Sequence, residues 1–157
     1  MIEIEIPSLG KISINSIVFD LNGTLAMTGQ ISDDVKTQLK MLANTVRVII
    51  ASADTRGNLA DIGKELGVET HRLTLDQPED EEKRLLVQEL GVENTAAVGN
   101  GINDSKMLKA AKIGIAVMGK EGAAVETINN ADIVVTDPVH ALNLFIQPII
   151  LKSTLRT

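Results

Sequence analysis

Short apolar runs alternate with segments of helical periodicity from Ser16 to about residue 146, and this alternation constrains the fold more than any other feature. The apolar runs are rich in β-branched residues and have the length of buried strands, whereas the segments between them space their apolar residues as amphipathic helices do. Strands that alternate with helices predict an α/β fold, in which helices cover both faces of a parallel central sheet. The expected strands span residues 16–19, 46–51, 71–75, 95–98, 113–117 and 133–135, and the expected helices span 32–43, 55–66, 78–91, 104–111, 121–128 and 139–146.

The segment before this alternation predicts an N-terminal β-hairpin. Residues 2–6 and 11–14 alternate apolar with polar side chains, and the turn residues 7–10 separate them. The 157 residues contain no internal repeat and no long linker. Their number suits one domain spanning residues 1–157, which is long enough to bury a core and too short for two ordinary domains.

Composition excludes several classes of partner and site. The chain has no Cys, which excludes a disulfide framework and a thiolate metal site. A net charge of −6, no Trp or Tyr and only two Phe leave neither a basic face nor aromatic platforms for nucleic acid. The first residues carry acids where a signal peptide has bases, and no apolar stretch approaches the roughly 18 residues of a membrane span. We therefore expect a cytoplasmic protein that binds neither nucleic acid nor membranes.

Polar and glycine residues gather where the expected strands end. In open parallel sheets, ligands bind at the carboxyl ends of the strands, so these segments are the candidates for a site. They are 20–24 (Asp-Leu-Asn-Gly-Thr), 52–55 (Ser-Ala-Asp-Thr), the region of Lys83, and 99–104 (Gly-Asn-Gly-Ile-Asn-Asp).

Asp20 is the first candidate for chemistry, because a carboxylate at the end of a buried strand faces the ligand crevice. It can attack phosphorus to form an aspartyl-phosphate, while the amides of the following loop, which contains Gly23, can hold phosphate oxygens. An Asp that follows a strand also commonly caps a turn, and this structural role remains the alternative.

Asp104, Ser52 and Lys83 complete the candidate set. Asp20 and Asp104 together could bind Mg²⁺, which prefers oxygen ligands, although Asp104 and Ser52 could instead cap helices. The Ser52 hydroxyl could donate to a phosphate oxygen. Lys83 lies in a helix start dominated by acids, where the helix dipole disfavours cations, and this favours a phosphate partner over a solvated position.

Taken in order, these segments resemble the four motifs of the haloacid dehalogenase superfamily. The matching residues are 20–25 (Asp-Leu-Asn-Gly-Thr-Leu), Ser52, Lys83 and 99–104. Within this superfamily the chain most resembles the phosphorylation domain of P-type ATPases and their small soluble, archaeal-type relatives, and residues 98–119 are similar to the ATPase hinge segment. The resemblance extends over about residues 15–146, and it implies a three-layer, Rossmann-like fold.

The resemblance implies a role for each candidate residue. Asp20 would be the nucleophile, and catalysis would also involve Asn22, Ser52 and Lys83. The phosphoryl group would be held by Gly23, Thr24, Ser52, Ala53 and Lys83. Mg²⁺ would be bound by the Asp20 carboxylate, the Asn22 backbone carbonyl, Asn100 and Asp104. Asp54, in a Ser-Ala-Asp similar to the ATPase Thr-Gly-Asp, would also face the site.

Two positions depart from the family pattern. Phosphatases of this superfamily carry Asp two residues after the nucleophile, as acid for the leaving group and base for water, but this chain has Asn22. An amide cannot move protons at neutral pH, so a contribution of about 10²–10⁴-fold to the rate is absent. Asn100 stands where the family has a metal-binding Asp, which predicts weaker Mg²⁺ binding. We therefore expect slow hydrolysis and a long-lived phosphoenzyme, unless the two Asn are engineered replacements.

The spacing of the motifs leaves no room for a second module. Only 11 residues separate Asp20 from Ser32, and 30 separate Ser52 from Lys83, so neither gap holds a cap or a nucleotide-binding domain. ATP would lack its usual binding module. An open site of this kind would admit a large phosphorylated substrate or be covered by a partner subunit, a second copy of the chain included. The hairpin and residues 147–157 are the candidates for that contact.

Two functions are compatible with these residues. One is a Mg²⁺-dependent phosphohydrolase or phosphotransferase that works slowly through phosphorylated Asp20. The other is a catalytically impaired phosphate-binding or regulatory protein that keeps the pocket. A purely structural subunit is disfavoured, because Asp20, Lys83 and Asp104 are all present. The substrate does not follow from the sequence.

Overall fold

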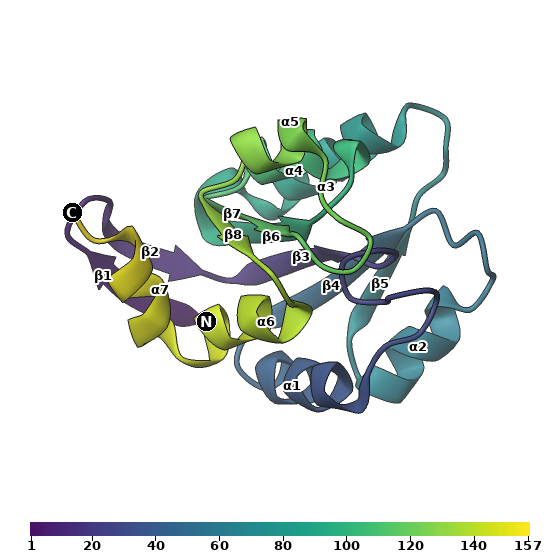
Figure 1. Cartoon of the computed structure of the whole chain (residues 1–157), viewed down its shortest axis with the longest axis horizontal. Coiled ribbons are helices and arrows are strands. Elements are labelled where there is room, and N and C mark those ends of the chain that lie inside the picture. The colour runs from purple at the N-terminus through teal and green to yellow at the C-terminus, as the bar shows by residue number, and fades with distance from the viewer.

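A six-stranded parallel sheet forms the centre of the molecule, as the computed structural model of residues 1–157 describes it (Figure 1). The strand order is β5-β4-β3-β6-β7-β8, and a separate antiparallel hairpin, β1-β2, precedes the sheet in the chain. The predicted fold class is confirmed, including the hairpin and the absence of any inserted cap domain.

The strands are β1 (Ile2–Ile6), β2 (Gly10–Ile14), β3 (Ser16–Asp20), β4 (Arg47–Ser52), β5 (Glu69–Arg72), β6 (Thr95–Gly99), β7 (Ile113–Val117) and β8 (Ile133–Val135). The helices are α1 (Asp33–Ala43), α2 (Leu59–Leu66), α3 (Glu79–Leu90), α4 (Ser105–Ala110), α5 (Val125–Asn129), α6 (Pro138–Ile146) and α7 (Pro148–Leu155), with short 3₁₀ turns η1 (Val92–Asn94) and η2 (Ile102–Asp104). None of these helices is both long and apolar enough to cross a lipid bilayer.

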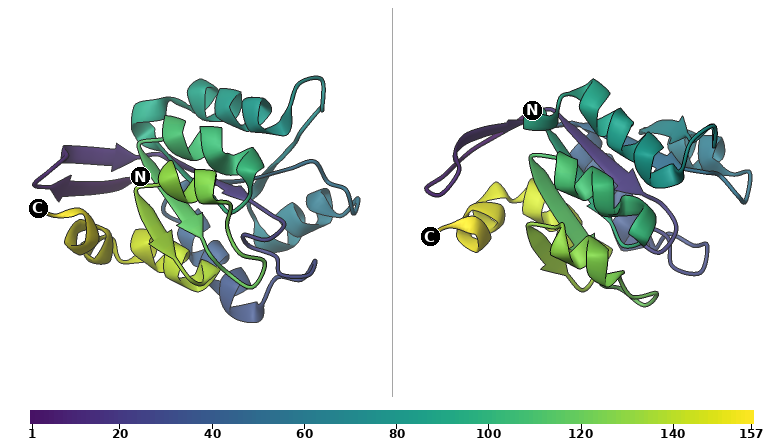
Figure 2. Two further views of the ribbon diagram at one scale, coloured as in Figure 1. Left: turned by 45° about the horizontal axis from the view of Figure 1, so that its top comes forward. Right: turned by 90° about the horizontal axis from the view of Figure 1, so that it is seen from above.

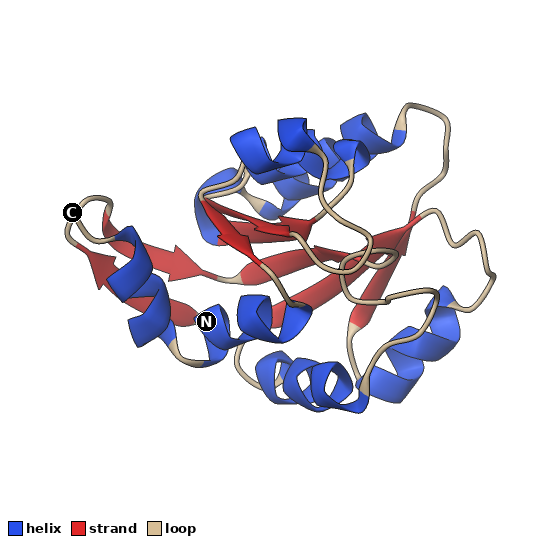
Figure 3. Cartoon of the chain, viewed as in Figure 1, coloured by secondary structure: helices blue, strands red, loops and turns tan.

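The helices form two layers, one on each face of the sheet. Helices α3, α4 and α5 cover one face, and α1, α2 and α6 cover the other (Figures 2 and 3). Successive side chains of a strand point to opposite faces, and β3 follows this rule: Ile17 and Phe19 belong to the core beneath α1 and α6, whereas Val18 packs with Leu86 and Met107 on the other face. Both faces are therefore apolar, and β3 is buried throughout.

The expected start of a helix agrees with the observed one where a capping side chain marks it. Helix α1 begins after Ser32, whose hydroxyl accepts from the Val35 N–H at 3.3 Å. Helix α2 starts four residues later than expected, because Asp54 takes a left-handed backbone conformation (φ 56°) and its carboxylate accepts from the Leu59 N–H at 2.9 Å. Ser52 therefore ends β4 without opening a helix.

Three further elements differ from the expectation. Strand β5 lies at 69–72, in register with Ile49 to Ser52 of β4, and the chain turns at Leu75 (φ 63°). Helix α5 begins at Val125, after a turn closed between Gly119 and Gly122. Helix α7 has no counterpart among the expected elements, which end at residue 146 and leave residues 147–157 as a tail.

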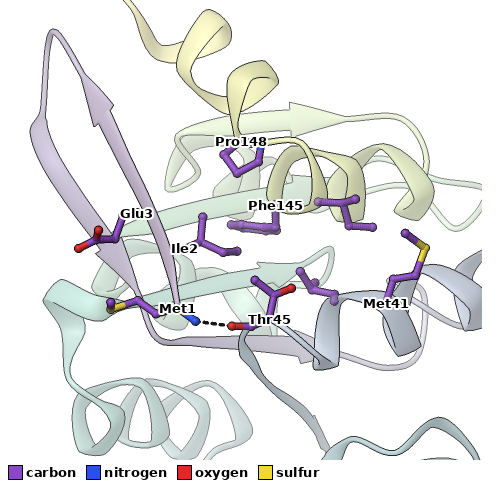
Figure 4. A pocket seen from close by; sticks show the side chains of 9 residues that line it. Met1, Ile2, Glu3, Met41, Thr45, Phe145 and Pro148 are labelled. Carbon is purple, nitrogen blue, oxygen red and sulfur yellow. Dashed lines mark hydrogen bonds between the residues drawn. The ribbon is translucent and has the colours of Figure 1, made fainter.

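The hairpin and α7 lie together at the amino-terminal edge of the sheet, where Ile14 of the hairpin leads directly into β3 (Figure 1). A pocket of about 460 Å³ opens there between β1, the end of α1 and the α6–α7 junction, lined among others by Ile2, Met41, Phe145 and Pro148 (Figure 4). Asp20 ends β3 at the opposite edge, so neither the hairpin nor α7 covers that edge of its own chain.

Helix α7 is held by one buried side chain, and this generates a stability prediction. Leu151 is fully buried, whereas Ile149 of the same helix is 66% exposed. We expect Leu151→Ala to lower the free energy of unfolding by about 2–5 kcal/mol, and Ile149→Ala to change it by less than about 0.5 kcal/mol. Urea denaturation of both variants measures the difference. Equal effects of the two substitutions would contradict the observed packing of α7.

Candidate active site

Asp20 is placed by the alternation of β3, the strand between β4 and β6 at the middle of the sheet. Asp20 lies two residues after Val18, and side chains two apart in a strand point to the same face of the sheet. Val18 packs with α3 and α4, so the Asp20 carboxylate points to the face that α3 covers. Asp20 is 6% exposed at the carboxyl end of the strand. A carboxylate this far buried requires a partner of opposite charge or hydrogen-bond donors.

Lys83 supplies the opposite charge. It is the fifth residue of α3 and only 1% exposed, although Lys is almost never fully buried without a partner. Its ammonium donates to Asp20 Oδ1 at 2.7 Å and to Asp104 Oδ1 at 2.7 Å. One cation therefore joins side chains from three separate segments of the chain.

The start of α3 is fixed by Glu82, the residue before Lys83. The Glu82 carboxylate accepts from the Thr74 N–H at 2.8 Å and from the Thr74 hydroxyl at 2.9 Å, which ties the loop after β5 to the helix. Burial opposes ionisation of this group, but these hydrogen bonds outweigh it and lower the pKa of Glu82. The helix that carries Lys83 is thus anchored at its first turn.

Asp104 is held in one orientation by its own loop. Its Oδ2 accepts from the Asn100 N–H at 2.9 Å and from the Gly101 N–H at 3.0 Å, which leaves Oδ1 for Lys83. The carboxylate lies directly over the backbone of Gly99, where a Cβ would come within 2.4 Å of the Asp104 Cγ. Only glycine at position 99 allows this approach.

Thr24 connects Asp20 to Asn100. Its buried hydroxyl lies 2.9 Å from Asp20 Oδ2 and 3.1 Å from Asn100 Oδ1. A hydroxyl has one hydrogen to donate, so one of these two oxygens lacks a full hydrogen bond. The Asn100 Nδ2 donates to the Gly122 carbonyl at 3.1 Å. Gly23 (φ 83°) passes so close that a Cβ there would lie 2.6 Å from Asn100 Nδ2.

The charges of this site depend on one another. Burial first, and then the charge of Asp104, raise the pKa of Asp20 to about 7, although Lys83 and Thr24 act in the opposite direction. Burial alone would lower the pKa of Lys83, but the two carboxylates outweigh burial and raise it. Lys83 therefore stays protonated at neutral pH, and the three groups together carry at most one negative charge.

The structure thus brings Asp20, Thr24, Lys83, Asn100 and Asp104 into direct contact and leaves other candidates outside this network. The Ser52 hydroxyl accepts from the Asp54 N–H at 3.0 Å and makes no hydrogen bond to Asp20 or Lys83. Ala53 follows it, half-buried, and the Asp54 carboxylate is taken up by the start of α2. Asn22 is exposed, and its side chain makes no hydrogen bond.

A set of polar side chains behind residues 100–104 was not predicted from the sequence. Thr127 of α5 is fully buried and donates to the Gly101 carbonyl at 2.6 Å. Asn130, one turn further along, donates to the Ser105 hydroxyl at 2.7 Å. Polar residues three apart on the inner face of a short helix are the signal that would have identified them. They hold the loop that orients Asp104.

Sequence comparison identifies the family of this chain and its relatives. A family model described as haloacid dehalogenase-like hydrolase matches residues 26–112. An uncharacterized protein of Methanocaldococcus jannaschii is 45% identical over 78 residues, which are 47% of this chain and 84% of that protein.

Metal-transporting ATPases match over a longer part of the chain. A copper-exporting P-type ATPase of Staphylococcus epidermidis is 32% identical over 108 residues, or 68% of this chain. A zinc-transporting ATPase of Bacillus subtilis is 35% identical over 108 residues. This chain spans only 13% and 16% of the length of these two transporters.

Solved structures share the fold at low sequence identity. The cobalt-bound deoxy-D-mannose-octulosonate 8-phosphate phosphatase of Haemophilus influenzae superposes with a TM-score of 0.72 at 19% identity, covering 92% of this chain and 94% of that chain. The corresponding enzyme of Moraxella catarrhalis, in complex with magnesium, phosphate and a KDO molecule, gives 0.70 at 18% identity, with 85% and 86% covered. Together they show that these phosphatases and this chain have the same fold.

Removing the cation between the two carboxylates generates a second prediction. We expect Lys83→Met to lower the free energy of unfolding by about 3 kcal/mol at neutral pH, because it leaves Asp20 and Asp104 buried without a counter-charge. This loss of stability should become smaller as the pH is lowered from about 8 to about 5. Without Lys83 the pKa of at least one of the two carboxyls is raised, so it becomes protonated in this range and the repulsion between them disappears.

Lys106 provides the matched control for this measurement. It forms ion pairs with Asp80 and Glu81 but is 46% exposed, so Lys106→Met should cost less than about 1 kcal/mol. Urea denaturation across this pH range compares the two variants. A Lys83→Met protein as stable as the Lys106→Met protein would contradict the bridging role of Lys83.

Proposed function

The chain belongs to the haloacid dehalogenase-like hydrolase family, and we propose that it is a Mg²⁺-dependent phosphohydrolase that forms an aspartyl-phosphate on Asp20 and turns over slowly. The observation that carries this proposal is the buried contact of Lys83 with both Asp20 and Asp104 at the carboxyl end of the central strand. Lys is almost never fully buried without a partner, and this one lies at the edge where open parallel sheets bind ligands.

Asp20 would act first, as the nucleophile. One carboxylate oxygen forms a bond to phosphorus while the bond from phosphorus to the oxygen of the leaving group breaks. Lys83 and Thr24 hold the two oxygens of this carboxylate in place, and the Lys83 charge would stabilise the anionic phosphoryl group as it is transferred. Water then attacks the aspartyl-phosphate, which releases inorganic phosphate and restores Asp20.

The donor set fits a divalent cation. Asp20 Oδ2 and Asn100 Oδ1 share the one hydrogen of Thr24, so one of these oxygens has capacity for a cation, and Mg²⁺ prefers such oxygen ligands. Asp20, Asn100, Asp104 and the Asn22 backbone carbonyl would hold it. When bound, Mg²⁺ screens the repulsion between the attacking carboxylate and the phosphoryl group.

Metal binding should be weak for this family. No group of three or more His, Cys, Asp or Glu side chains is arranged to hold a metal ion, so the ion would be bound by two carboxylates, the Asn100 side-chain amide and the Asn22 backbone carbonyl. A divalent ion would also bring the net charge of the site to at least +1, because Lys83 cancels one of the two carboxylates. A positive site favours a phosphate dianion, which supports tight retention of the phosphate.

Asn22 would make turnover slow. A carboxyl at this position could protonate the leaving group and later accept a proton from the hydrolytic water, and the amide does neither. The exposed Asn22 side chain has no hydrogen-bond partner that could compensate. Hydrolysis of the aspartyl-phosphate would be slowed most, because the attacking water must lose a proton.

The alternative is a phosphate-binding or regulatory protein with the same pocket and no useful turnover. The amides at Asn22 and Asn100 favour this candidate over an efficient hydrolase, and the presence of Asp20, Lys83 and Asp104 favours it over a structural role. Its substrate or ligand would carry a phosphoryl group. The open edge of the sheet, with no cap domain over it, sets no upper limit to the size of that molecule.

Replacement of the nucleophile tests the proposal. With p-nitrophenyl phosphate and Mg²⁺, the wild-type protein should release p-nitrophenol, and Asp20→Asn should abolish this release because the amide cannot form the phosphoenzyme. Glu93→Gln, which removes a surface partner of Lys112, should leave the rate unchanged. Equal rates from the wild-type and Asp20→Asn proteins would exclude covalent catalysis by Asp20.

Restoration of an acid tests the cause of the slow step. We expect Asn22→Asp to raise the steady-state rate by roughly 10²-fold or more, because it provides a group that can exchange protons with leaving group and water. The rate is measured with an alkyl phosphate as well as with p-nitrophenyl phosphate, since the alkyl leaving group needs the acid. An unchanged rate with both substrates would favour the phosphate-binding alternative.

A further inference from the structure

The chain has two Asn-Gly steps, Asn22-Gly23 and Asn100-Gly101, and both lie in the candidate active site. In such a step the backbone nitrogen of the glycine can attack the Asn Cγ, because glycine has no side chain to obstruct the approach. Succinimide formation requires that this N–H be free of its hydrogen bond and that the Asn side chain can rotate. The structure restrains the two steps very differently.

Asn22 is weakly restrained. Its side chain is exposed and makes no hydrogen bond, so it can rotate toward the backbone of Gly23. The backbone hydrogen bond that must open is the one from the Gly23 N–H to the neutral Ala26 carbonyl, at 2.8 Å in a turn whose residues 23–26 are buried. Local opening of this one turn costs less free energy than unfolding of the whole molecule.

Asn100 is strongly restrained. Its side-chain oxygen lies 3.1 Å from the Thr24 hydroxyl, whose one hydrogen it shares with Asp20, and its side-chain nitrogen donates to the Gly122 carbonyl. The nitrogen that would attack, Gly101 N, donates to the buried carboxylate of Asp104, and hydrogen bonds to charged groups are the stronger ones. Deamidation at this position requires loss of all three contacts.

We propose that Asn22 is a deamidation site of the folded protein and that Asn100 is protected. The Gly23 nitrogen bonds to Asn22 Cγ and loses its proton, the Cγ–Nδ2 bond breaks, and Nδ2 leaves as ammonia. Water then opens the succinimide. Cleavage of the bond from the imide nitrogen to Cγ gives aspartate at position 22, and cleavage of the other imide bond gives isoaspartate. The overall change is one water consumed and one ammonia released, with no redox step.

This modification would change the activity of the site, and that part of the inference rests on the proposed function. Aspartate at position 22 supplies the missing proton-transfer group two residues after Asp20. Isoaspartate adds one atom to the main chain between Asp20 and Gly23, whose backbone is in close contact with Asn100, so the isoaspartate form should not gain activity. A protein preparation would then become more active as it ages.

The test is incubation of the folded protein in mildly alkaline buffer, followed by peptide mapping. Trypsin places Asn22 in the peptide 12–36 and Asn100 in the peptide 85–106, and fragment ions locate the mass gain of an amide-to-acid exchange. We expect conversion at position 22 to exceed conversion at position 100 about tenfold or more, given the extra hydrogen bonds at Asn100. Incubation in ¹⁸O water confirms that the new oxygen comes from hydrolysis.

Two controls make the result decisive. In urea, where the chain is unfolded, both Asn-Gly steps should convert at similar rates, which shows that the fold causes the difference. Asn22→Gln should show no conversion at position 22 in the same period, because its side chain would have to close a larger ring. Absence of conversion at position 22 in the folded protein, or equal conversion at both positions, would overturn the proposal.

Activity measured on the same samples separates this inference from the proposed function. The phosphatase rate should rise in proportion to the fraction of aspartate at position 22, toward the rate of the Asn22→Asp variant, and should stay constant in Asn22→Gln. Conversion without a gain in rate, together with an inactive Asn22→Asp protein, would refute the proposed function and leave the modification site standing. An active Asn22→Asp protein without conversion on ageing would refute only the modification.

Discussion

The buried ion pairs of Lys83 with Asp20 and Asp104 are the interaction on which the rest of the site depends. Two carboxylates from the ends of β3 and the β6–α4 loop could not be buried side by side without this cation. Three surrounding features position these groups. The alternation of side chains along β3 points Asp20 toward α3, and Glu82 anchors the start of that helix. The amides of the loop orient Asp104. The same arrangement gathers these charged groups at the carboxyl end of the central strand.

The two Asn residues act on different parts of the chemistry. Asn22 is exposed and free, so its effect is the absence of a proton-transfer group. Asn100 is built into the structure through Thr24 and Gly122, so its effect is electrostatic: the site carries one negative charge fewer than a site with Asp there. Under the proposed function, slow hydrolysis and firm retention of phosphate would both follow from this pair of positions, so a slow enzyme and a phosphate-binding protein are close alternatives.

Most of the fold could be predicted from sequence, because the β-branched runs and caps such as Ser32 carry local signals. The start of α2 could not, since it depends on the left-handed backbone of Asp54. The core of the site followed from the positions of Asp20, Lys83 and Asp104 at strand and helix ends. The network around Thr127 did not, because it forms only when α5 packs against the loop at Gly101. Contacts between segments distant in sequence leave no local pattern.

The central claim is a phosphoenzyme on Asp20 that forms faster than it is hydrolysed. The most direct measurement is the pre-steady-state release of p-nitrophenol from p-nitrophenyl phosphate, with the intact mass of the protein recorded during turnover. Because p-nitrophenolate leaves without needing an acid, we predict a burst equal to the protein concentration and a protein mass increased by one phosphoryl group. Release that is linear from the start, with no mass increase at any time, would contradict the claim.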